Sequence, residues 1–90
     1  MSRDVSWTVS ALRDLEGIRA YLDQFNPTAA RLVAARLIEA GDSLTTFPKR
    51  GRLLGRDRVL MVVWPYLIRY RVLEDRIVIL RVRHGARYQA

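Results

Sequence analysis

The spacing of apolar residues changes once along this 90-residue chain, and that change limits the folds open to it. Between residues 10 and 46 apolar side chains recur every three or four positions, which is typical of amphipathic helices. From residue 58 onward the chain consists of short runs rich in β-branched and aromatic residues, as strands are. Ninety residues supply one hydrophobic core, so we expect a single α+β domain over residues 1–90.

The helical part has recognisable boundaries. Residues 5–9 alternate apolar and polar side chains, which predicts a short first strand, and Ser10 can cap a following helix. Asn26 and Pro27 end that helix and begin a second, because Asn caps well and Pro is tolerated at the first helical position. The sequence predicts an antiparallel helical hairpin with apolar stripes formed by Leu12, Leu15, Ile18, Leu22 and Phe25, and by Ala30, Val33, Ala34, Leu37, Ile38, Gly41 and Leu44.

The second part predicts a small, mainly antiparallel β-sheet against which the hairpin packs. Residues 47–55 contain Pro, two Gly and several cations and are predicted to form an exposed loop. Three strands follow at 58–64, 66–73 and 76–83, with Glu74 and Asp75 as a two-residue turn. If Leu73 faces Arg76, one face of the sheet carries Tyr66, Ile68, Tyr70, Val72, Ile77, Ile79, Arg81 and Arg83. We expect the helices to cover one face and the other to be basic and partly apolar.

Charge is distributed unevenly. Residues 49–90 hold eleven Lys and Arg against three acids, whereas residues 1–48 hold five Arg against six acids. The second part therefore carries a net charge of +8 and the first −1, which accounts for the total of +7. A positive field concentrated on one part of a small domain suits an anionic partner.

Several classes of function are disfavoured by what the sequence lacks. Cysteine is absent, which removes disulfides, thiolate nucleophiles and cysteine-ligated zinc. There is no phosphate-binding Gly-rich loop, no histidine pair for a metal and no Gly-x-Ser-x-Gly turn, and the acids are scattered. We expect no cofactor and no metal. The apolar run at 59–65 is too short to span a bilayer, so we expect a soluble, cytoplasmic protein that does not bind membranes.

Local motifs, taken in order, give the chain a family resemblance. They are Asp14-Leu15 with Ile18 and Tyr21, the segment Asn26-Pro27-Thr28-Ala29-Ala30, Phe47-Pro48 followed by Gly51-Arg52, then Pro65-Tyr66, Tyr70-Arg71-Val72 and His84-Gly85-Ala86-Arg87. With this order of elements the chain resembles the ParE/RelE superfamily of toxins from type II toxin–antitoxin systems over almost its whole length. The resemblance implies the same fold, a growth-arresting toxin and a cognate antitoxin that neutralises it in a hetero-oligomer.

The superfamily has two activities, and this chain is more similar to one of them. RelE-like members cut messenger RNA on the ribosome, whereas ParE-like members with an assigned target inhibit DNA gyrase. Several RelE-like nucleases carry a catalytic arginine directly after the tyrosine equivalent to Tyr66, where this chain has Leu67. Their other arginine commonly follows the position of His84, where this chain has Gly85. The resemblance therefore implies a gyrase inhibitor that is not an enzyme.

The candidate site residues follow from the charge and from this ending. Residues that would contact a target are Lys49, Arg50, Arg52, Arg81, Arg83, His84 and Arg87. In the alternative of a metal-independent, ribosome-dependent RNase, His84 and Tyr88 would transfer protons while Arg81, Arg83 and Arg87 hold phosphate. The sequence favours a structural or antitoxin-contacting role for His84 over a catalytic one, and the loop cations can equally be solvated charges. Tyr66, Tyr70, Trp7 and Trp64 are predicted to pack in the core.

A third interpretation remains open at this point. Members of such families can lose toxicity, and the chain would then be a basic module that binds nucleic acid or serves as a repressor's partner. Steep salt dependence of DNA binding without growth arrest would indicate it, because neutralised phosphates release counterions.

Overall fold

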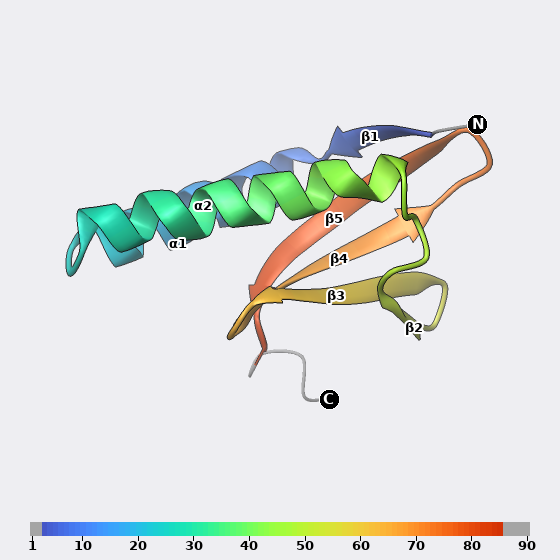
Figure 1. The fold of residues 1–90 in the computed structure, drawn as a ribbon. Helices are drawn as coiled ribbons and strands as arrows, with labels where there is room; N and C mark the ends of the chain where they lie inside the picture. Colours follow the sequence, from blue (N-terminus) through green and yellow to red (C-terminus); the bar gives the residue numbers. More distant parts are fainter. Residues whose placement is uncertain (1–2, 86–90) are drawn as a thin grey trace.

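The computed structural model describes residues 3–85. The elements are β1 (Asp4–Trp7), α1 (Val9–Asp23), α2 (Pro27–Asp42), a 3₁₀ turn (Ser43–Thr45), β2 (Arg52–Leu54), β3 (Asp57–Val63), β4 (Tyr66–Val72) and β5 (Arg76–His84). The two helices run antiparallel along one side of a curved sheet, as Figure 1 shows. The predicted α+β class, the first strand and the helical hairpin are confirmed.

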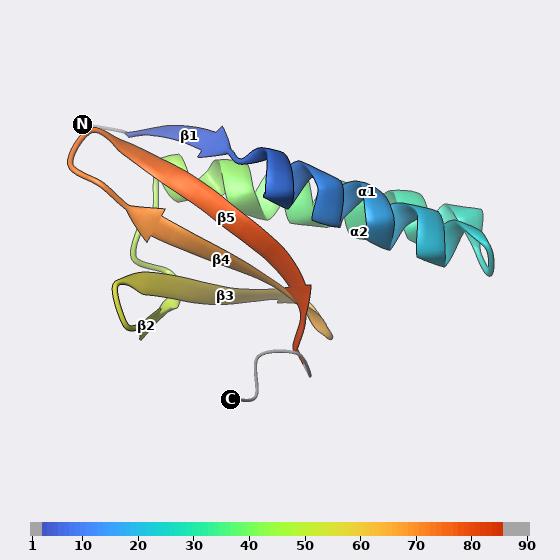
Figure 2. The ribbon, with the colours of Figure 1, turned by 180° about the vertical axis from the view of Figure 1, so that it is seen from behind.

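The sheet has five strands in the order β1-β5-β4-β3-β2 (Figure 2). β1 pairs with β5 in parallel and the other pairs are antiparallel, so the sheet is mainly antiparallel as predicted. The turn at Glu74 and Asp75 is also confirmed, since the Leu73 N–H donates to the carbonyl of Arg76 at 2.8 Å. The predicted loop at 47–55 needs correction because Arg52–Leu54 forms β2. Gly55 adopts φ +60°, a turn conformation that glycine tolerates, and folds these residues back onto β3.

Side-chain caps set where each helix begins, and the cap of α1 also bonds to the sheet. Asn26 caps α2 as predicted, with its Oδ1 accepting from the Ala29 N–H at 3.1 Å. Ser10 is not the cap of α1, which begins two residues earlier than predicted, at Val9, with Thr8 as its cap. The Thr8 hydroxyl accepts from the Ala11 N–H at 3.0 Å and donates to the Leu80 carbonyl on β5 at 2.9 Å. A contact with the sheet therefore decides which of the two hydroxyl residues caps the helix.

The core lies between the hairpin and one face of the sheet. Its fully buried members include Ala11, Leu37, Leu44, Ile68, Tyr70, Ile77 and Ile79. Most of the predicted stripe of α2 is buried, but in α1 the buried line passes through Ala11 and Leu15. Leu12 and Phe25 are 49% and 70% exposed, and Ile38 is also exposed, so these three stripe assignments were wrong. Trp64, predicted to pack, is 82% exposed in the turn between β3 and β4.

An irregularity in β5 changes which side chains share a face. Tyr70 faces Ile79, but Arg69 faces Arg81, which leaves Leu80 without a partner in β4. The shift by one residue places Val82 on the helix-covered face and aligns Arg81 and Arg83 with Arg69 and Leu67. The predicted grouping of Arg81 and Arg83 with Tyr66 and Ile68 was therefore wrong. The face away from the helices, here called the open face, gains these arginines.

Candidate functional site

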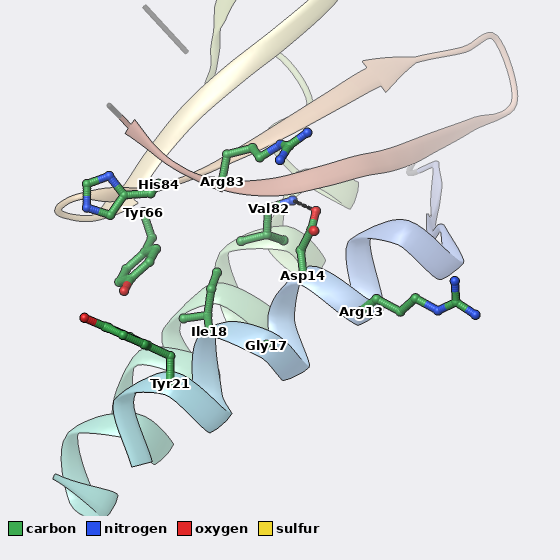
Figure 3. A pocket seen from close by; sticks show the side chains of 9 residues that line it. All are labelled: Arg13, Asp14, Gly17, Ile18, Tyr21, Tyr66, Val82, Arg83 and His84. Atoms are coloured by element: carbon green, nitrogen blue, oxygen red, sulfur yellow. Dashed lines mark hydrogen bonds between the residues drawn. The ribbon is translucent and has the colours of Figure 1, made fainter. Parts of the chain in front are cut away.

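A pocket of about 520 Å³ lies between α1 and the end of β5. It is lined by Arg13, Asp14, Gly17, Ile18, Tyr21, Tyr66, Val82, Arg83 and His84. Figure 3 shows the tyrosines of α1 and β4 with their hydroxyls directed toward one another across this pocket. The pocket thus combines two phenols, an imidazole and a carboxylate, while the guanidiniums of Arg13 and Arg83 point away from the tyrosines (Figure 3).

His84 stands at the exposed end of β5 and packs against Tyr66. The two residues face each other in the pairing of β4 with β5, and their ring centroids are 5.7 Å apart in an edge-on arrangement. Tyr66 is half-buried, so its ring gives the exposed histidine an apolar support on one side. An imidazole in such a place can transfer a proton or donate a hydrogen bond to a partner.

Asp14 closes the edge of β5 beside the pocket. Its Oδ2 lies 2.7 Å from Arg81 Nε and accepts the Val82 backbone N–H at 3.0 Å, and its Oδ1 accepts from Arg81 Nη2 at 3.0 Å. Burial raises the pKa of Asp14, but the hydrogen bonds from Arg81 and Val82 and the nearby guanidinium charges hold it below its ordinary value. The carboxylate therefore stays charged and neutralises Arg81.

The structure brings together only some of the predicted site residues. Arg81, Arg83 and His84 are neighbours on β5, and the last two line the pocket. Arg87 and Tyr88 lie outside the described residues. Lys49 and Arg50 precede β2 and Arg52 begins it, at the opposite edge of the sheet from β1. Arg50 donates from Nη1 to the Ser43 hydroxyl at 2.7 Å, which ties its side chain to the end of α2.

Hydrogen bonds to the Tyr70 side chain hold the basic loop at residues 48–51, before β2. The buried Tyr70 hydroxyl donates to the Pro48 carbonyl and accepts from the Gly51 N–H, both at 2.8 Å. Arg58 Nη1 donates to the Gly51 carbonyl at 2.7 Å. A Cβ on Gly51 would lie 2.9 Å from the Tyr70 hydroxyl, so glycine is required for this close approach. The packing predicted for Tyr70 is confirmed, and its hydroxyl fixes the loop.

Sequence reasoning missed an arginine pair on the open face. Asp57 is only 2% exposed, and its two carboxylate oxygens accept from Arg69 Nε at 2.7 Å and from Arg71 Nε at 2.6 Å. Burial raises the pKa of Asp57, yet hydrogen bonds from the two arginines and their charges lower it below its ordinary value. One signal in the sequence could have predicted this cluster. Arg69 and Arg71 lie two residues apart on one strand, and the preceding strand contains a single acid, Asp57.

The described helices include none long and apolar enough to cross a membrane. Within residues 3–85, no three His, Cys, Asp or Glu side chains come together as metal ligands.

Two solved structures share this fold. It superposes with a TM-score of 0.81 on a chain of the chromosomal ParDE toxin–antitoxin system of P. aeruginosa, at 24% identity, covering 92% of this chain and 96% of that one. A chain of the RelBE2 toxin–antitoxin complex of Mycobacterium tuberculosis gives a TM-score of 0.68 at 24% identity, covering 93% and 99%. A helical hairpin on a five-stranded mixed sheet is thus the fold of ParE/RelE toxins.

Sequence comparison gives the family. Residues 5–88 match the family described as "ParE toxin of type II toxin-antitoxin system, parDE", and the chain belongs to it. It is 51% identical over 84 residues to "Toxin RelE2" of Caulobacter vibrioides, covering 92% of this chain and 96% of that protein. It is 39% identical over 89 residues to "Putative toxin Y4kP" of Sinorhizobium fredii, covering 94% and 92%. The resemblance drawn from the motifs is confirmed: this is a toxin of the ParE/RelE superfamily of type II toxin–antitoxin systems.

Proposed function

We propose that this toxin arrests growth by binding DNA gyrase and not by cutting RNA. The supporting observation is the packing at the two positions where RelE-like nucleases carry arginine. Leu67 is 3% exposed, and Gly85 donates its N–H to the Pro65 carbonyl at 2.6 Å. A Cβ on Gly85 would lie 3.1 Å from that carbonyl oxygen. The chain lacks both arginines. In their places it has a buried leucine and a glycine that is hydrogen-bonded to the turn before β4.

The charge around His84 also supports binding over cleavage. RNA cleavage without a metal needs cations placed against the charge that grows on phosphorus. Arg81 is bound to Asp14 through both carboxylate oxygens, and the lowered pKa keeps that carboxylate negative. Asp14 thus offsets the charge of Arg81, which would otherwise be the cation nearest to a phosphate at this end of β5. A protein partner, by contrast, can use the same carboxylate as a hydrogen-bond acceptor.

A cognate antitoxin belongs to the same proposal. Two solved structures with this fold come from a ParDE toxin–antitoxin system and a RelBE2 toxin–antitoxin complex. We infer that the neighbouring antitoxin covers this toxin in a cytoplasmic hetero-oligomer. The net charge of +8 on residues 49–90 complements an acidic segment of such a partner.

The deciding experiment compares two purified systems. Toxin is added to DNA gyrase, with supercoiling and gyrase-dependent DNA cleavage as readouts, and separately to translating ribosomes, with messenger RNA length as readout. The proposal expects lost supercoiling or accumulated cleaved DNA, and intact message. His84→Gln and Arg31→Gln are tested in both systems, the second being a control on α2. Unchanged gyrase activity at toxin concentrations that arrest cells would contradict the proposal.

The alternative is a ribosome-dependent RNase, favoured by one feature of the pocket. His84, Tyr66 and Arg83 border the same cavity, which is the kind of grouping that proton transfer to a phosphodiester requires. Arg81, Arg87 and Tyr88 would complete the set. This alternative expects message cut in codon register and loss of cutting in His84→Gln, with Arg31→Gln unaffected. If neither target responds and induced cells grow normally, the chain is the non-toxic basic module.

A further inference from the structure

Arginines from neighbouring strands form a regular array on the open face. Arg52 on β2 faces Val59, Val59 faces Arg69 on β4, and Arg69 faces Arg81 on β5. Arg71 and Arg83 lie two residues further along β4 and β5, on the same face as Arg69 and Arg81. Adjacent strands are about 4.8 Å apart and alternate residues of a strand about 6.8 Å apart, so Arg69 is one strand spacing from Arg81 and two from Arg52.

Asp57 gives this array a fixed centre. The carboxylate is buried, while the side chains of Arg69 and Arg71 are 36% and 34% exposed, so the two arginines cover the acid. Each binds the carboxylate through Nε, which fixes the plane and direction of both guanidiniums. Taken together, the side chains of Asp57, Arg69 and Arg71 carry a net charge of +1. Planar, oriented guanidiniums match the geometry of phosphate oxygens.

The open face offers charge with few other means of recognition. The tyrosines of the sheet, Tyr66 and Tyr70, belong to the helix-covered face. Val59 and Leu67, which lie between the arginines in the strand register, are buried. The exposed apolar side chains on this face, Met61 and Leu54, face Leu67 and Asp57 and lie toward the margins of the array. Single-stranded nucleic acids are usually held by aromatic stacking, and acidic polypeptides anchor through apolar side chains. Neither contact is available at the centre of the array, whereas a duplex backbone presents phosphates alone.

We propose that the open face of this toxin binds the phosphate backbone of duplex DNA without reading its sequence. Arg69 and Arg71, oriented by Asp57, form the central contact, and Arg52 extends it toward the sheet edge. This activity belongs to the toxin itself and does not depend on gyrase being the target. If gyrase is the target, the same face meets the DNA that the enzyme holds.

The proposal makes a prediction that net charge alone does not. Asp57→Asn raises the net charge from +7 to +8, so a purely electrostatic attraction would tighten DNA binding. The carboxamide, however, has one acceptor oxygen in place of two and no charge, so the two arginines lose their common anchor. We expect the dissociation constant of Asp57→Asn to rise despite the added positive charge.

The test uses purified toxin and a fluorescent DNA duplex of mixed sequence, with anisotropy measured from 50 to 200 mM KCl. The logarithm of the association constant falls linearly with the logarithm of the salt concentration, and each phosphate contact makes that slope steeper by about 0.9. Arg52→Gln, at an exposed edge position, should make that slope shallower by about 0.9 and weaken binding. Arg31→Gln removes the same charge from the exposed side of α2 and should leave the slope unchanged. Circular dichroism and melting curves establish that each variant folds.

Three outcomes would overturn the proposal. Equal weakening by Arg52→Gln and Arg31→Gln would show that binding follows net charge and involves no particular face. Tighter binding by folded Asp57→Asn would show that the arginine orientation is irrelevant. Competition by poly-glutamate as effective as that by unlabelled duplex, at equal charge concentration, would identify the face as a surface for acidic protein. If Asp57→Asn does not fold, the comparison of Arg52→Gln with Arg31→Gln decides alone.

Discussion

Asp14 on α1 and Arg81 on β5 form a two-point ion pair across 67 residues of sequence, with Nε–Oδ2 and Nη2–Oδ1 distances of 2.7 and 3.0 Å. The same Oδ2 accepts the backbone N–H of Val82. Because β1 pairs with β5 only as far as Ile79, the remaining edge of β5 would otherwise end in unpaired backbone groups. One helix side chain therefore completes the sheet where the last strand approaches the pocket.

Asp14→Ala should destabilise the protein. The change leaves Val82 N–H without its acceptor and Arg81 without its partner, which costs about 1–3 kcal/mol in the free energy of unfolding. Urea unfolding followed by circular dichroism measures it. Glu16→Ala is the matched control, because Glu16 is an exposed acid two residues further along the same helix. This substitution should change the free energy of unfolding by less than about 0.5 kcal/mol. Equal effects of the two substitutions would mean that the ion pair does not hold α1 to β5.

Acid should destabilise the fold through the two paired aspartates. The pKa values of Asp14 and Asp57 are lower in the folded protein than their ordinary value of about 3.9. The unfolded chain therefore takes up protons first as pH falls, so their contribution is complete above about pH 5 and is lost through and below pH 4. Melting temperatures measured between pH 7 and pH 3 should fall steeply only in the acid range. Asp14→Asn should show a shallower fall than the unmodified chain, and an identical acid dependence would contradict the assignment.

The order of elements was accessible from the sequence because each signal is local. Asn26 and Pro27 mark the helical hairpin through capping and backbone preference, and the strands at 58–83 carry β-branched residues in short runs. The structure places the ends of the last three strands within one residue of the predicted ranges. β2 was missed because three residues are too few to establish a periodicity, and its pairing depends on the turn at Gly55.

The parts of the site that were missed depend on contacts between distant segments. Arg81, Arg83 and His84 were predicted together because they are sequence neighbours. Asp14 and Tyr21 join them from α1 only after the hairpin packs on the sheet. The shift at Leu80 carries no compositional signal, so the faces of Arg81 and Arg83 were misassigned. The burial of Asp57 under two arginines likewise depends on the register between β3 and β4. A shift of that register by one residue would place Asp57 and the arginines on opposite faces of the sheet.

Tyr70→Phe should loosen the basic loop while leaving the core filled. The ring remains buried, but Pro48 carbonyl and Gly51 N–H lose their shared partner, which costs about 1–3 kcal/mol in stability. Trypsin should then cleave faster after Lys49 or Arg50. Tyr21→Phe, which removes an exposed hydroxyl from α1, is the control and should leave the cleavage rate unchanged. Unaltered cleavage in Tyr70→Phe would mean that Arg58 and Arg50 hold the loop without the hydroxyl.

Replacing glycine by alanine should have opposite effects at two helical positions. Gly17→Ala, where an added Cβ meets nothing within 4 Å, should stabilise the protein by up to about 1 kcal/mol through helix propensity. Gly41→Ala has the same propensity gain, but its Cβ would lie 2.4 Å from Trp7 Cζ2 and 2.7 Å from Ile79 Cδ1. Neither neighbour can move freely, because Ile79 is fully buried and Trp7 Nε1 donates to Asp42 Oδ1 at 3.3 Å. Overpacking costs about 1–3 kcal/mol and at this separation should exceed the gain. Thermal unfolding of both variants should therefore shift in opposite directions, and a rise for Gly41→Ala would show that α2 does not pack against β1 and β5 as closely as described.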